Sequence, residues 1–439
     1  MQRTQNRTRA SQPAISRRQF LGWAGLGLSG AAGLRLPLVH GAVASDRLVV
    51  LIQAVGGWDV TSFCDPKLNV AGEREINTWA TSAGIGRAGN LDYAPFGGNR
   101  AFFDKYHDRT LVVNGIDAQT NSHSAGVVHT WSGRLSEGYP SLSALFTGSS
   151  APDLPMSYLN FGGYAETAGI ARYTRVDNPK HLKQLAAPNR SPWEDGKRFF
   201  SDPDFERIRA YRRDRLEMLT LEGRHSARGA RNRRAYETGM QNVDKLGAFA
   251  DLIPDDDALQ PVVNIANRQQ HLRRQIQIAL LAFKSGTSVA ADLVQHGYDT
   301  HKQHDVDHAP LLQYLTEAID YLWEEAEALG LAERIVLVVG SDFGRTPFYN
   351  GSAGKDHWPI GSVLIQEKNA PWGGRAIGLT DEGHRAVAPD PVTMRPAADG
   401  TRVFPRHVHH ALRGYLGLND GPLAARFPFA AVEDLPLFA

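Results

Sequence analysis

The sequence predicts an α/β fold whose central sheet is mainly parallel and is flanked by helices on both faces. A continuous apolar run at residues 47–53 is typical of a strand buried on both faces. Such runs alternate with amphipathic stretches at helical spacing in the later half of the chain. Several of the runs are followed directly by Asp and His residues, as expected where function lies in the loops after parallel strands.

The strand-like runs come in a regular succession. The first is bounded by Gly56 and Gly57, which end the apolar stretch. Further strands are predicted at residues 110–114, 156–161, 290–294, 335–339 and 362–365. Because helices separate the later strands, we expect a sheet that is parallel for the most part and covered on both faces.

Two amphipathic helices are predicted between the later strands. Their apolar stripes are Leu272, Ile276, Ala279, Leu280 and Phe283 in the first, and Leu312, Leu315, Ile319, Leu322, Ala326 and Leu329 in the second. Gly286 follows the first stripe and Gly330 follows the second. Glycine is favoured just beyond a helix C-terminus, because it adopts the left-handed conformation without a steric penalty.

Residues 1–44 predict a twin-arginine signal peptide. Arg17 and Arg18 precede a small, apolar, glycine-rich stretch, and the Ala-Val-Ala sequence at residues 42–44 suits cleavage before Ser45. A short membrane anchor is the alternative, but the run ends at a cleavage site. We expect a periplasmic or extracellular protein, exported by the twin-arginine translocation machinery and without a stable membrane span after cleavage.

The remaining chain, residues 45–439, is mildly acidic and is expected to form one α/β domain. The whole sequence has a formal net charge of +1, and removing the six arginines of residues 1–44, where no acid occurs, leaves −5. This balance gives no reason to expect binding to nucleic acid. Cys64 is the single cysteine of the sequence, so the chain has no internal disulfide.

A charged segment from about residue 188 to residue 254 interrupts the strand–helix alternation. It contains ten arginines between Arg207 and Arg234, interleaved and flanked by acidic residues. We interpret the segment as a helical insertion with a solvated, salt-bridged face. A cap over the functional site is one arrangement that such an insertion allows.

Three short segments gather residues that bind divalent metals. The first runs from Gly297 to His304, the second from Ser341 to Thr346, and the third from Lys355 to Trp358. Their metal-binding side chains are those of Asp299, His301, His304, Asp342, Asp356 and His357. Carboxylates and imidazoles from neighbouring strand ends offer a divalent cation charged oxygen and neutral nitrogen together.

Several of these residues, and the nearby Asp59 and Arg345, have alternative roles. Asp299 and His301 are two apart, so they would share one face of an extended segment, but a turn could bring His304 into the place of His301. Asp59 follows two glycines and could cap a turn instead of binding a metal. Asp356 could bind the metal or orient a neighbouring imidazole. Arg345 could pair with Asp342, or grip a substrate oxyanion.

The order of these motifs resembles the alkaline phosphatase/sulfatase superfamily. The closest resemblance is to its twin-arginine-secreted branch of unknown function, the DUF-1501 family. The motifs that carry it span nearly the whole mature chain: Gly56-Gly57-Trp58-Asp59, Ser122-His123, Asp299-Thr300-His301, Ser341 to Thr346, Asn350-Gly351-Ser352 with Asp356-His357, and Phe404 to Val408. The resemblance implies an alkaline phosphatase-like fold and one or two divalent ions, with zinc, manganese, calcium and magnesium left open.

The resemblance also implies roles for particular positions. As metal ligands it suggests Asp59, Asp299, His301 or His304, Asp342 and His357. The expected Asp-His pair reads Asp342-Phe343 here, so one imidazole is missing, and His123 could replace it. A nucleophile would lie in the segment with Ser122 and Ser124, where either serine could instead cap a helix. His123 could equally act as an acid or base.

Two hypotheses about function follow. The first is a secreted metal-dependent hydrolase that acts on a phosphate or sulfate ester, carried by a small molecule or a polymer. The second is a secreted binding or assembly protein that kept the scaffold and lost catalysis. The hydrolase is the leading hypothesis, and the substitution at Phe343 and the absence of an unambiguous nucleophile motivate the second one. The sequence leaves the choice between enzyme and binding protein open.

Overall fold

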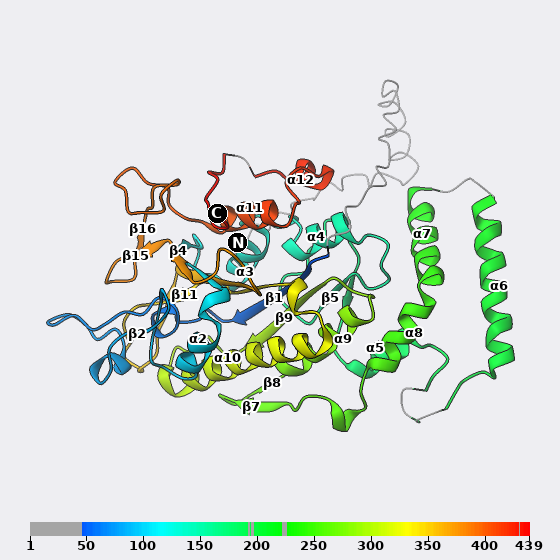
Figure 1. The fold of residues 1–439 in the computed structure, drawn as a ribbon, viewed down its shortest axis with the longest axis horizontal. Coiled ribbons are helices and arrows are strands. Elements are labelled where there is room, and N and C mark those ends of the chain that lie inside the picture. The colour runs from blue at the N-terminus through cyan, green and yellow to red at the C-terminus, as the bar shows by residue number, and fades with distance from the viewer. Residues whose placement is uncertain (1–45, 192–193, 195–196, 222–225, 430) are drawn as a thin grey trace, which may run out of the picture. The chain divides into compact units, whose positions relative to one another are not determined.

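A central eight-stranded sheet organises the domain (Figure 1). The computed structural model describes residues 46–191, 194, 197–221, 226–429 and 431–439. The predicted signal peptide lies outside these residues. The strand order is β14 (Arg375–Ile377), β4 (Thr110–Asp117), β13 (Ile360–Glu367), β10 (Ile335–Ser341), β1 (Leu48–Val55), β9 (Ala290–His296), β5 (Tyr158–Asn160) and β6 (Tyr173–Arg175). The strands predicted from the apolar runs are therefore confirmed.

The sheet is mainly parallel, as predicted, with one exception. β1 pairs in parallel with β10 and β9, β9 with β5, β5 with β6, and β14 with β4. β13 is antiparallel to both β10 and β4. No helix is assigned between β10 and β13, and a parallel return needs a long crossover, so the chain turns back antiparallel.

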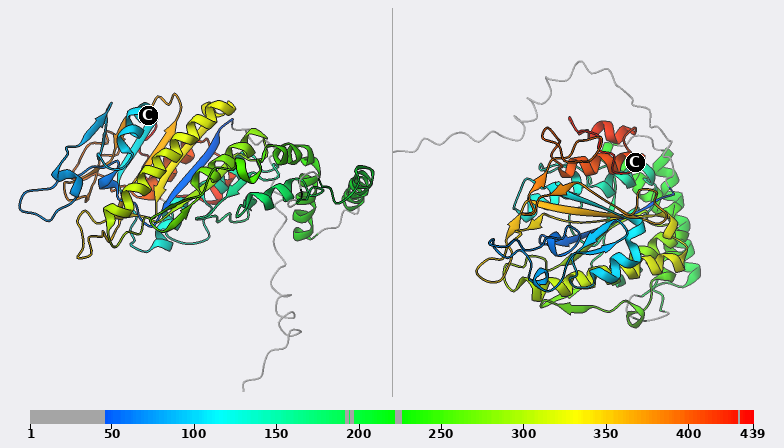
Figure 2. Two further views of the ribbon diagram at one scale, coloured as in Figure 1. Left: turned by 90° about the horizontal axis from the view of Figure 1, so that it is seen from below. Right: turned by 60° about the vertical axis from the view of Figure 1, so that its left-hand side comes forward.

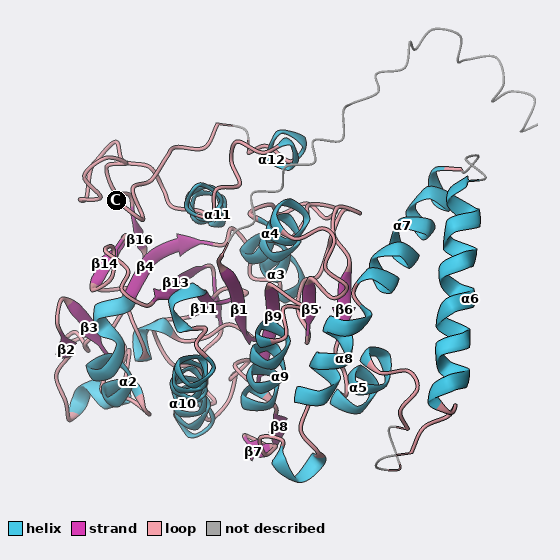
Figure 3. Ribbon diagram, turned by 45° about the vertical axis from the view of Figure 1, so that its right-hand side comes forward, coloured by secondary structure: helices cyan, strands magenta, loops and turns pink. Residues whose placement is uncertain are grey.

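Helices cover both faces of the sheet (Figures 2 and 3). The helices along the chain are α2 (Asn99–Tyr106), α3 (His123–Ser132), α4 (Leu142–Ser150), α5 (Pro179–Ala186), α6 (Asp202–Leu221), α7 (Ala227–Gln241), α8 (Val243–Leu252), α9 (Leu272–Lys284), α10 (His304–Leu329), α11 (Pro405–Tyr415) and α12 (Pro422–Arg426). Helices α9 and α10 contain the two predicted apolar stripes. Gly330 caps α10 in the left-handed conformation, as predicted.

The hydrophobic core is divided by the sheet into two clusters. Alternate residues of β1 point to opposite faces, so Val50 and Ile52 belong to one cluster and Val49 and Leu51 to the other. The first cluster includes side chains of α2, α9 and α10, and the second includes side chains of α4 and α11. Because both faces are covered, the ends of the strands are left for the functional loops.

Short two-stranded sheets lie outside the central sheet. They are β2 (Gly86–Ala88) with β3 (Leu91–Tyr93), β7 (Val263–Ile265) with β8 (Arg268–Gln270), β11 (Gly344–Arg345) with β12 (His357–Trp358), and β15 (Leu379–Thr380) with β16 (Ala386–Val387). The β11–β12 pair matters most for the site, since it joins Arg345 to His357 in register. In the described part of the chain, no helix combines the length and apolarity needed to cross a membrane.

The charged insertion is helical, as predicted, but it does not cap the strand ends. It includes α6, α7 and α8, and α8 contacts α5 and α9. In Figure 3, α6 and α7 lie beyond β6, the strand at one edge of the sheet, and Figures 1 and 3 both show them well away from β11. A cap over the site is therefore not the arrangement that this chain adopts.

Candidate metal centre

Loops that carry the predicted site residues meet at one end of the central sheet. β1 lies between β9 and β10, and the register pairs Val55 with His296 and Ala54 with Ser341. These parallel strands therefore end together, and the loops after them leave the sheet side by side. The antiparallel β13 begins at this same end, so the preceding β12 brings His357 to it.

Asp299 is the common neighbour of three histidines. Its Oδ1 atom lies 3.0 Å from Nε2 of His301, 3.2 Å from Nε2 of His357 and 3.4 Å from Nε2 of His123. The Nε2 atoms of His301 and His357 are 3.0 Å apart. We refer to these four residues as the histidine cluster. The side chain of Asp299 is 45% exposed, so the cluster is open to solvent.

The other ring nitrogen of each histidine faces an oxygen acceptor. Nδ1 of His301 is 2.7 Å from Oδ1 of Asp356, and Nδ1 of His357 is 2.8 Å from the carbonyl oxygen of Asn121. Nδ1 of His123 donates to Oδ2 of Asp342. Because a carbonyl or carboxylate oxygen can only accept, each Nδ1 carries a hydrogen, and each ring therefore directs its Nε2 atom toward Asp299. In the neutral tautomer with hydrogen on Nδ1, that Nε2 atom presents a lone pair.

This arrangement fits a divalent cation. With Nδ1 protonated, the facing Nε2 atoms of His301 and His357 present only lone pairs, which repel unless a cation or a proton lies between them. Ligands at roughly 2.0–2.1 Å around a tetrahedral zinc are about 3.3 Å apart. The ligand atoms of His123, Asp299 and His357 all lie within 4.8 Å of one another. Imidazoles with a carboxylate suit zinc and similar metals.

Arg345 holds Asp299 in place from inside the protein. The guanidinium is fully buried, and Nη2 donates to Oδ1 of Asp299 at 2.5 Å. Three further donors of Arg345 go to the carbonyl oxygens of Gly56, Gly57 and Lys355. The alternative pairing with Asp342 is therefore not observed, and the fully buried guanidinium is not exposed to a substrate.

The charge of Arg345 also sets the ionisation of Asp299. Burial alone would raise the pKa of this carboxyl group, but the hydrogen bond and positive charge of Arg345 outweigh it and, with His357 and His123, lower the pKa to about 2. Asp299 is thus a carboxylate over the whole physiological range. A negative oxygen beside three imidazole nitrogens is a donor set that suits a divalent cation.

Asp342 orients an imidazole and lies behind the cluster. It is fully buried, and its Oδ1 accepts hydrogen bonds from the backbone amides of Gly56 and Gly57 at 3.0 and 2.9 Å. Its Oδ2 accepts from Nδ1 of His123, which raises the pKa of that histidine against the opposing effect of burial. In this structure Asp342 thus supports an imidazole, and its direct role as a metal ligand stays a prediction.

Phe343 forms an aromatic wall beside two of the histidines. Its ring centroid lies 4.8 Å from that of His123 and 4.7 Å from that of His357. The position where the superfamily pattern places an imidazole is therefore an apolar contact here. His123, from the start of α3, occupies the cluster in its place, which is the relocation that the sequence left open.

Asp59 and His304 belong to a separate buried cluster, which we call the lysine cluster. Oδ2 of Asp59 accepts from Nζ of Lys355 at 2.7 Å and from Nε2 of His304 at 3.0 Å. Thr61 and Ser62 donate to the same carboxylate. Asp59, His304 and Lys355 are all fully buried. Protein groups already contact both side chains in this structure, and the role of Asp59 and His304 as metal ligands stays a prediction.

Charge pairing explains why the carboxylate of Asp59 is tolerated in the core. Burial would raise the pKa of Asp59, but the positive charge of Lys355 and the hydrogen bond from His304 hold it well below its usual range. His304 uses both ring nitrogens, since Nδ1 accepts from the hydroxyl of Thr300 at 2.7 Å. A metal ion would have to displace these bonds, whereas the histidine cluster presents unused lone pairs.

Several residues support the histidine cluster, and only some of them could be found from the sequence. The sequence predicts that Asp356 either binds the metal or orients an imidazole, and in the structure it contacts His301. Asn350 steadies that contact, with Nδ2 donating to Asp356 at 3.0 Å and to the carbonyl oxygen of His301 at 3.1 Å. The roles of the Asn121 carbonyl oxygen and the Lys355 ammonium group could not be predicted from the sequence. A backbone oxygen and a single lysine belong to no motif with a characteristic spacing.

Ser122 and Ser124 lie at the start of α3, next to His123. Ser122 occupies the N-cap position, and its hydroxyl lies 3.3 Å from that of Ser124. Both residues are exposed. Within the described residues, neither hydroxyl has a hydrogen bond to the histidine cluster. Their role as nucleophile stays a prediction.

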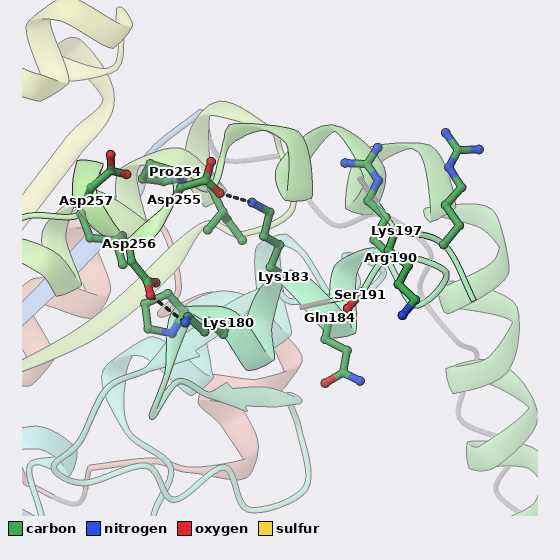
Figure 4. Close-up of a pocket in the computed structure, with 14 residues that line it drawn as sticks. Lys180, Lys183, Gln184, Arg190, Ser191, Lys197, Pro254, Asp255, Asp256 and Asp257 are labelled. Atoms are coloured by element: carbon green, nitrogen blue, oxygen red, sulfur yellow. Dashed lines mark hydrogen bonds and ion pairs between the residues drawn. The ribbon is translucent and has the colours of Figure 1, made fainter. Parts of the chain in front are cut away.

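A larger cleft lies away from the histidine cluster. It has a volume of about 590 Å³ and is lined by α5 and by residues 190, 191, 197, 198, 253–257 and 259 (Figure 4). Lys180 pairs with Asp256 at 2.6 Å, and Lys183 pairs with Asp255 at 3.0 Å. These neighbouring cations and carboxylates offset one another, and no residue of the histidine cluster lines the cleft. We therefore place the candidate site at the strand ends.

Comparison of the sequence with protein families gives one match that covers most of the chain. Residues 46–397 match the family described as "Protein of unknown function (DUF1501)". This chain is a member of that family. The predicted resemblance is confirmed, and the match spans the segments of all four histidine-cluster residues. The comparison with curated proteins found no match.

Solved structures of low sequence identity are similar to the chain. One is alkaline phosphatase from the Antarctic bacterium TAB5, with 8% identity, a TM-score of 0.37, and coverage of 86% of this chain and 100% of that chain. Another is the lipoteichoic acid synthase LtaP from Listeria monocytogenes, with 8% identity, a TM-score of 0.36, and coverage of 87% and 74%. A third is the PsFucS1 sulfatase from Pseudoalteromonas sp., with 13% identity, a TM-score of 0.34, and coverage of 77% and 65%.

Proposed function

We propose that this DUF1501 protein is a metal-dependent hydrolase of phosphate or sulfate esters. The observation that carries the proposal is the convergence of three imidazole Nε2 atoms on Oδ1 of Asp299, each ring fixed from behind through Nδ1. His123, His301, His357 and Asp299 would hold the ion. Zinc fits this donor set best, and manganese, calcium and magnesium are the alternatives.

The ion and the protein have separate tasks in this proposal. When bound, a divalent ion supplies positive charge that stabilises the charge developing on a transferring phosphoryl or sulfuryl group. Asp342, Asp356 and the carbonyl of Asn121 keep the imidazoles in the required tautomer and orientation. Arg345 keeps Asp299 ionised and fixed against the strand ends.

The start of α3 supports an anionic substrate. Ser122 and Ser124 lie at the N-terminus of this ten-residue helix, where unpaired backbone amides favour a negative group. Either hydroxyl would serve as the nucleophile. His123 connects the start of α3 to the proposed metal site, because it belongs to both α3 and the histidine cluster. Export by the twin-arginine route, supported by the pattern in residues 1–44, completes the proposal.

Metal content is the first test. Wild-type protein purified without chelator is expected to contain stoichiometric divalent metal by mass spectrometry, and Asp299→Ala and His357→Ala are expected to lose it. His410→Ala is the matched control, because His410 lies on α11 outside the cluster and should leave the metal content unchanged. Wild-type protein without metal after loading with zinc, manganese, calcium and magnesium in turn would refute the proposed site.

Activity is the second test. Aryl phosphate and aryl sulfate esters are offered to the metal-loaded protein, with Ser122→Ala and Ser124→Ala beside the His357→Ala variant. Turnover that disappears in His357→Ala and persists in His410→Ala is the expected result. A serine that acts as nucleophile should lower kcat on substitution while the bound metal remains.

The second candidate is a binding or assembly protein on the same scaffold. Phe343 favours it, because an apolar ring stands beside the histidines where an imidazole was expected. In that case, the protein binds metal in the histidine cluster and hydrolyses neither ester. Turnover dependent on His357 would reject this candidate.

A further inference from the structure

The helices α6 and α7 form the outermost part of the charged insertion (Figure 3). None of the 20 residues of α6 is buried, and Thr238 is the one buried residue of α7. The two helices contact each other, and α7 also contacts α8. Their exposure calls for an explanation, because a surface that packs so little against its own domain is available to a partner.

The arginines of α7 are not neutralised within the described structure. The helix carries four arginines and a single acidic residue, Glu237. No arginine of α7 forms an ion pair with a described carboxylate. In α6, by contrast, Arg207 pairs with Asp204 and Arg209 with Glu206. The predicted salt-bridged surface is therefore confirmed near the start of α6 and wrong for α7.

Three of these arginines form a row along α7. Arg228, Arg231 and Arg234 are exposed and spaced three residues apart, which places them on one side of the helix, about 4.5 Å further along its axis at each step. Like charges at this spacing repel one another and destabilise the helix. A regular row of guanidinium groups is the arrangement that a chain of repeated anionic groups would neutralise.

We propose that this arginine row docks a linear anionic polysaccharide that bears sulfate or phosphate groups. The inference rests on the proposed function, because the polymer would then carry the ester that the histidine cluster hydrolyses. Guanidinium groups bind sulfate and phosphate through two parallel hydrogen bonds, so each arginine of the row can hold one such group. Docking on α7 would raise the concentration of the polymer near the domain.

Other polyanions fit this surface less well. A membrane would need an apolar face, but the exposed Tyr211 and Met218 of α6 share their face with Asp204 and Asp214 by helical spacing. Single-stranded nucleic acid is usually held by aromatic stacking. The aromatic residue of α7, Tyr236, directs its hydroxyl to the carbonyl of Arg212 on α6 and does not lie in the row.

Binding of fluorescein-labelled heparin to the full chain tests the proposal. The variant Arg228→Gln/Arg231→Gln/Arg234→Gln is expected to bind at least ten times more weakly at 50 mM salt. Its plot of log affinity against log salt should be shallower by about two to three, as expected when three contacts are lost. The control Arg87→Gln/Arg100→Gln/Arg385→Gln removes the same charge from arginines that pair with acids elsewhere, and should bind like the wild type.

Each outcome of this experiment is decisive. Equal loss in the two triple variants, or no loss in either, would overturn the proposal, as would tighter binding of an oligonucleotide or of phosphatidylglycerol vesicles. Hydrolysis of a small aryl ester should not change in the α7 variant, since that substrate bypasses the docking helix. Arginine-dependent heparin binding without ester turnover would leave the docking surface standing and remove the proposed function.

Discussion

Lys355 and Asp59 form a fully buried ion pair, with Nζ 2.7 Å from Oδ2. Nζ also lies 2.9 Å from Oδ1 of Asn77 and 3.2 Å from Oγ1 of Thr61, so the ammonium is saturated. The pair ties the loop that carries His357 to the end of β1. The histidine cluster is thus supported by a second, metal-independent cluster in the core beneath it.

Breaking this pair from one side should strongly destabilise the fold. Lys355→Met leaves the carboxylate of Asp59 buried without its cation, and we expect a loss of about 3–5 kcal/mol in the free energy of unfolding. Urea denaturation measures it. Lys368→Met removes a surface lysine that pairs with Glu327 and Glu333, and should lose less than about 1 kcal/mol. Equal effects of the two substitutions would contradict the assignment. The double variant Lys355→Met/Asp59→Asn should recover part of the loss.

Asp292 should make stability depend on pH. Burial raises the pKa of this carboxyl group from 3.8 to about 7, although hydrogen bonds from Ser143 and Tyr158 oppose the rise. The folded state holds the proton more tightly than the unfolded state, so this stabilisation is complete below about pH 4 and is lost as the pH rises through 7. The loss is roughly 3–5 kcal/mol.

The variant Asp292→Asn isolates this contribution, because the amide keeps an acceptor and cannot ionise. We expect it to be more stable than the wild type at pH 8, with a smaller difference at pH 5. Unfolding free energies measured at pH 5, 6, 7 and 8 check the slope. Parallel curves for the two proteins would show that Asp292 does not titrate in this range.

The residues behind the imidazoles should tune metal affinity. Asp356→Ala removes the acceptor at Nδ1 of His301, and the loss of such a contact typically weakens metal binding by about 10–100-fold. Competition with a fluorescent chelator measures this affinity. Asp381→Ala, a surface carboxylate paired with Arg385, should bind metal like the wild type. An unchanged metal affinity in Asp356→Ala would show that Asp356 does not support metal binding.

Gly56 should tolerate no side chain. Its φ angle is +119°, and an added Cβ would lie 2.5 Å from the backbone nitrogen of Asp299. We therefore expect Gly56→Ala to destabilise the protein by more than about 2 kcal/mol and to weaken metal binding. Gly239→Ala is the control, because α7 leaves open space there and alanine favours a helix by roughly 0.5–1 kcal/mol. Similar melting temperatures for both variants would contradict this picture.

The fold was predictable because its signals are local. Apolar runs and helical stripes identified the strands and the two long helices, and Gly330 marked a helix end. The direction of β13 was not predicted, since it depends on the missing crossover helix after β10. For the site, the sequence predicted that the segments of Asp299 and His357 lie at the strand ends, and the structure brings them together there. The position of Asp59 outside the histidine cluster was not predicted, because Asp59 pairs with Lys355, which is 296 positions away in sequence.

The antiparallel direction of β13 has a consequence for synthesis of the chain. Because the strand begins at the functional end of the sheet, the last member of the histidine cluster, His357, reaches it only after β1, β9 and β10 exist to receive it. The first member, His123, lies more than two hundred residues earlier. A nascent chain therefore has no complete ligand set until most of it has left the ribosome, so all four residues can bind an ion together only late in synthesis.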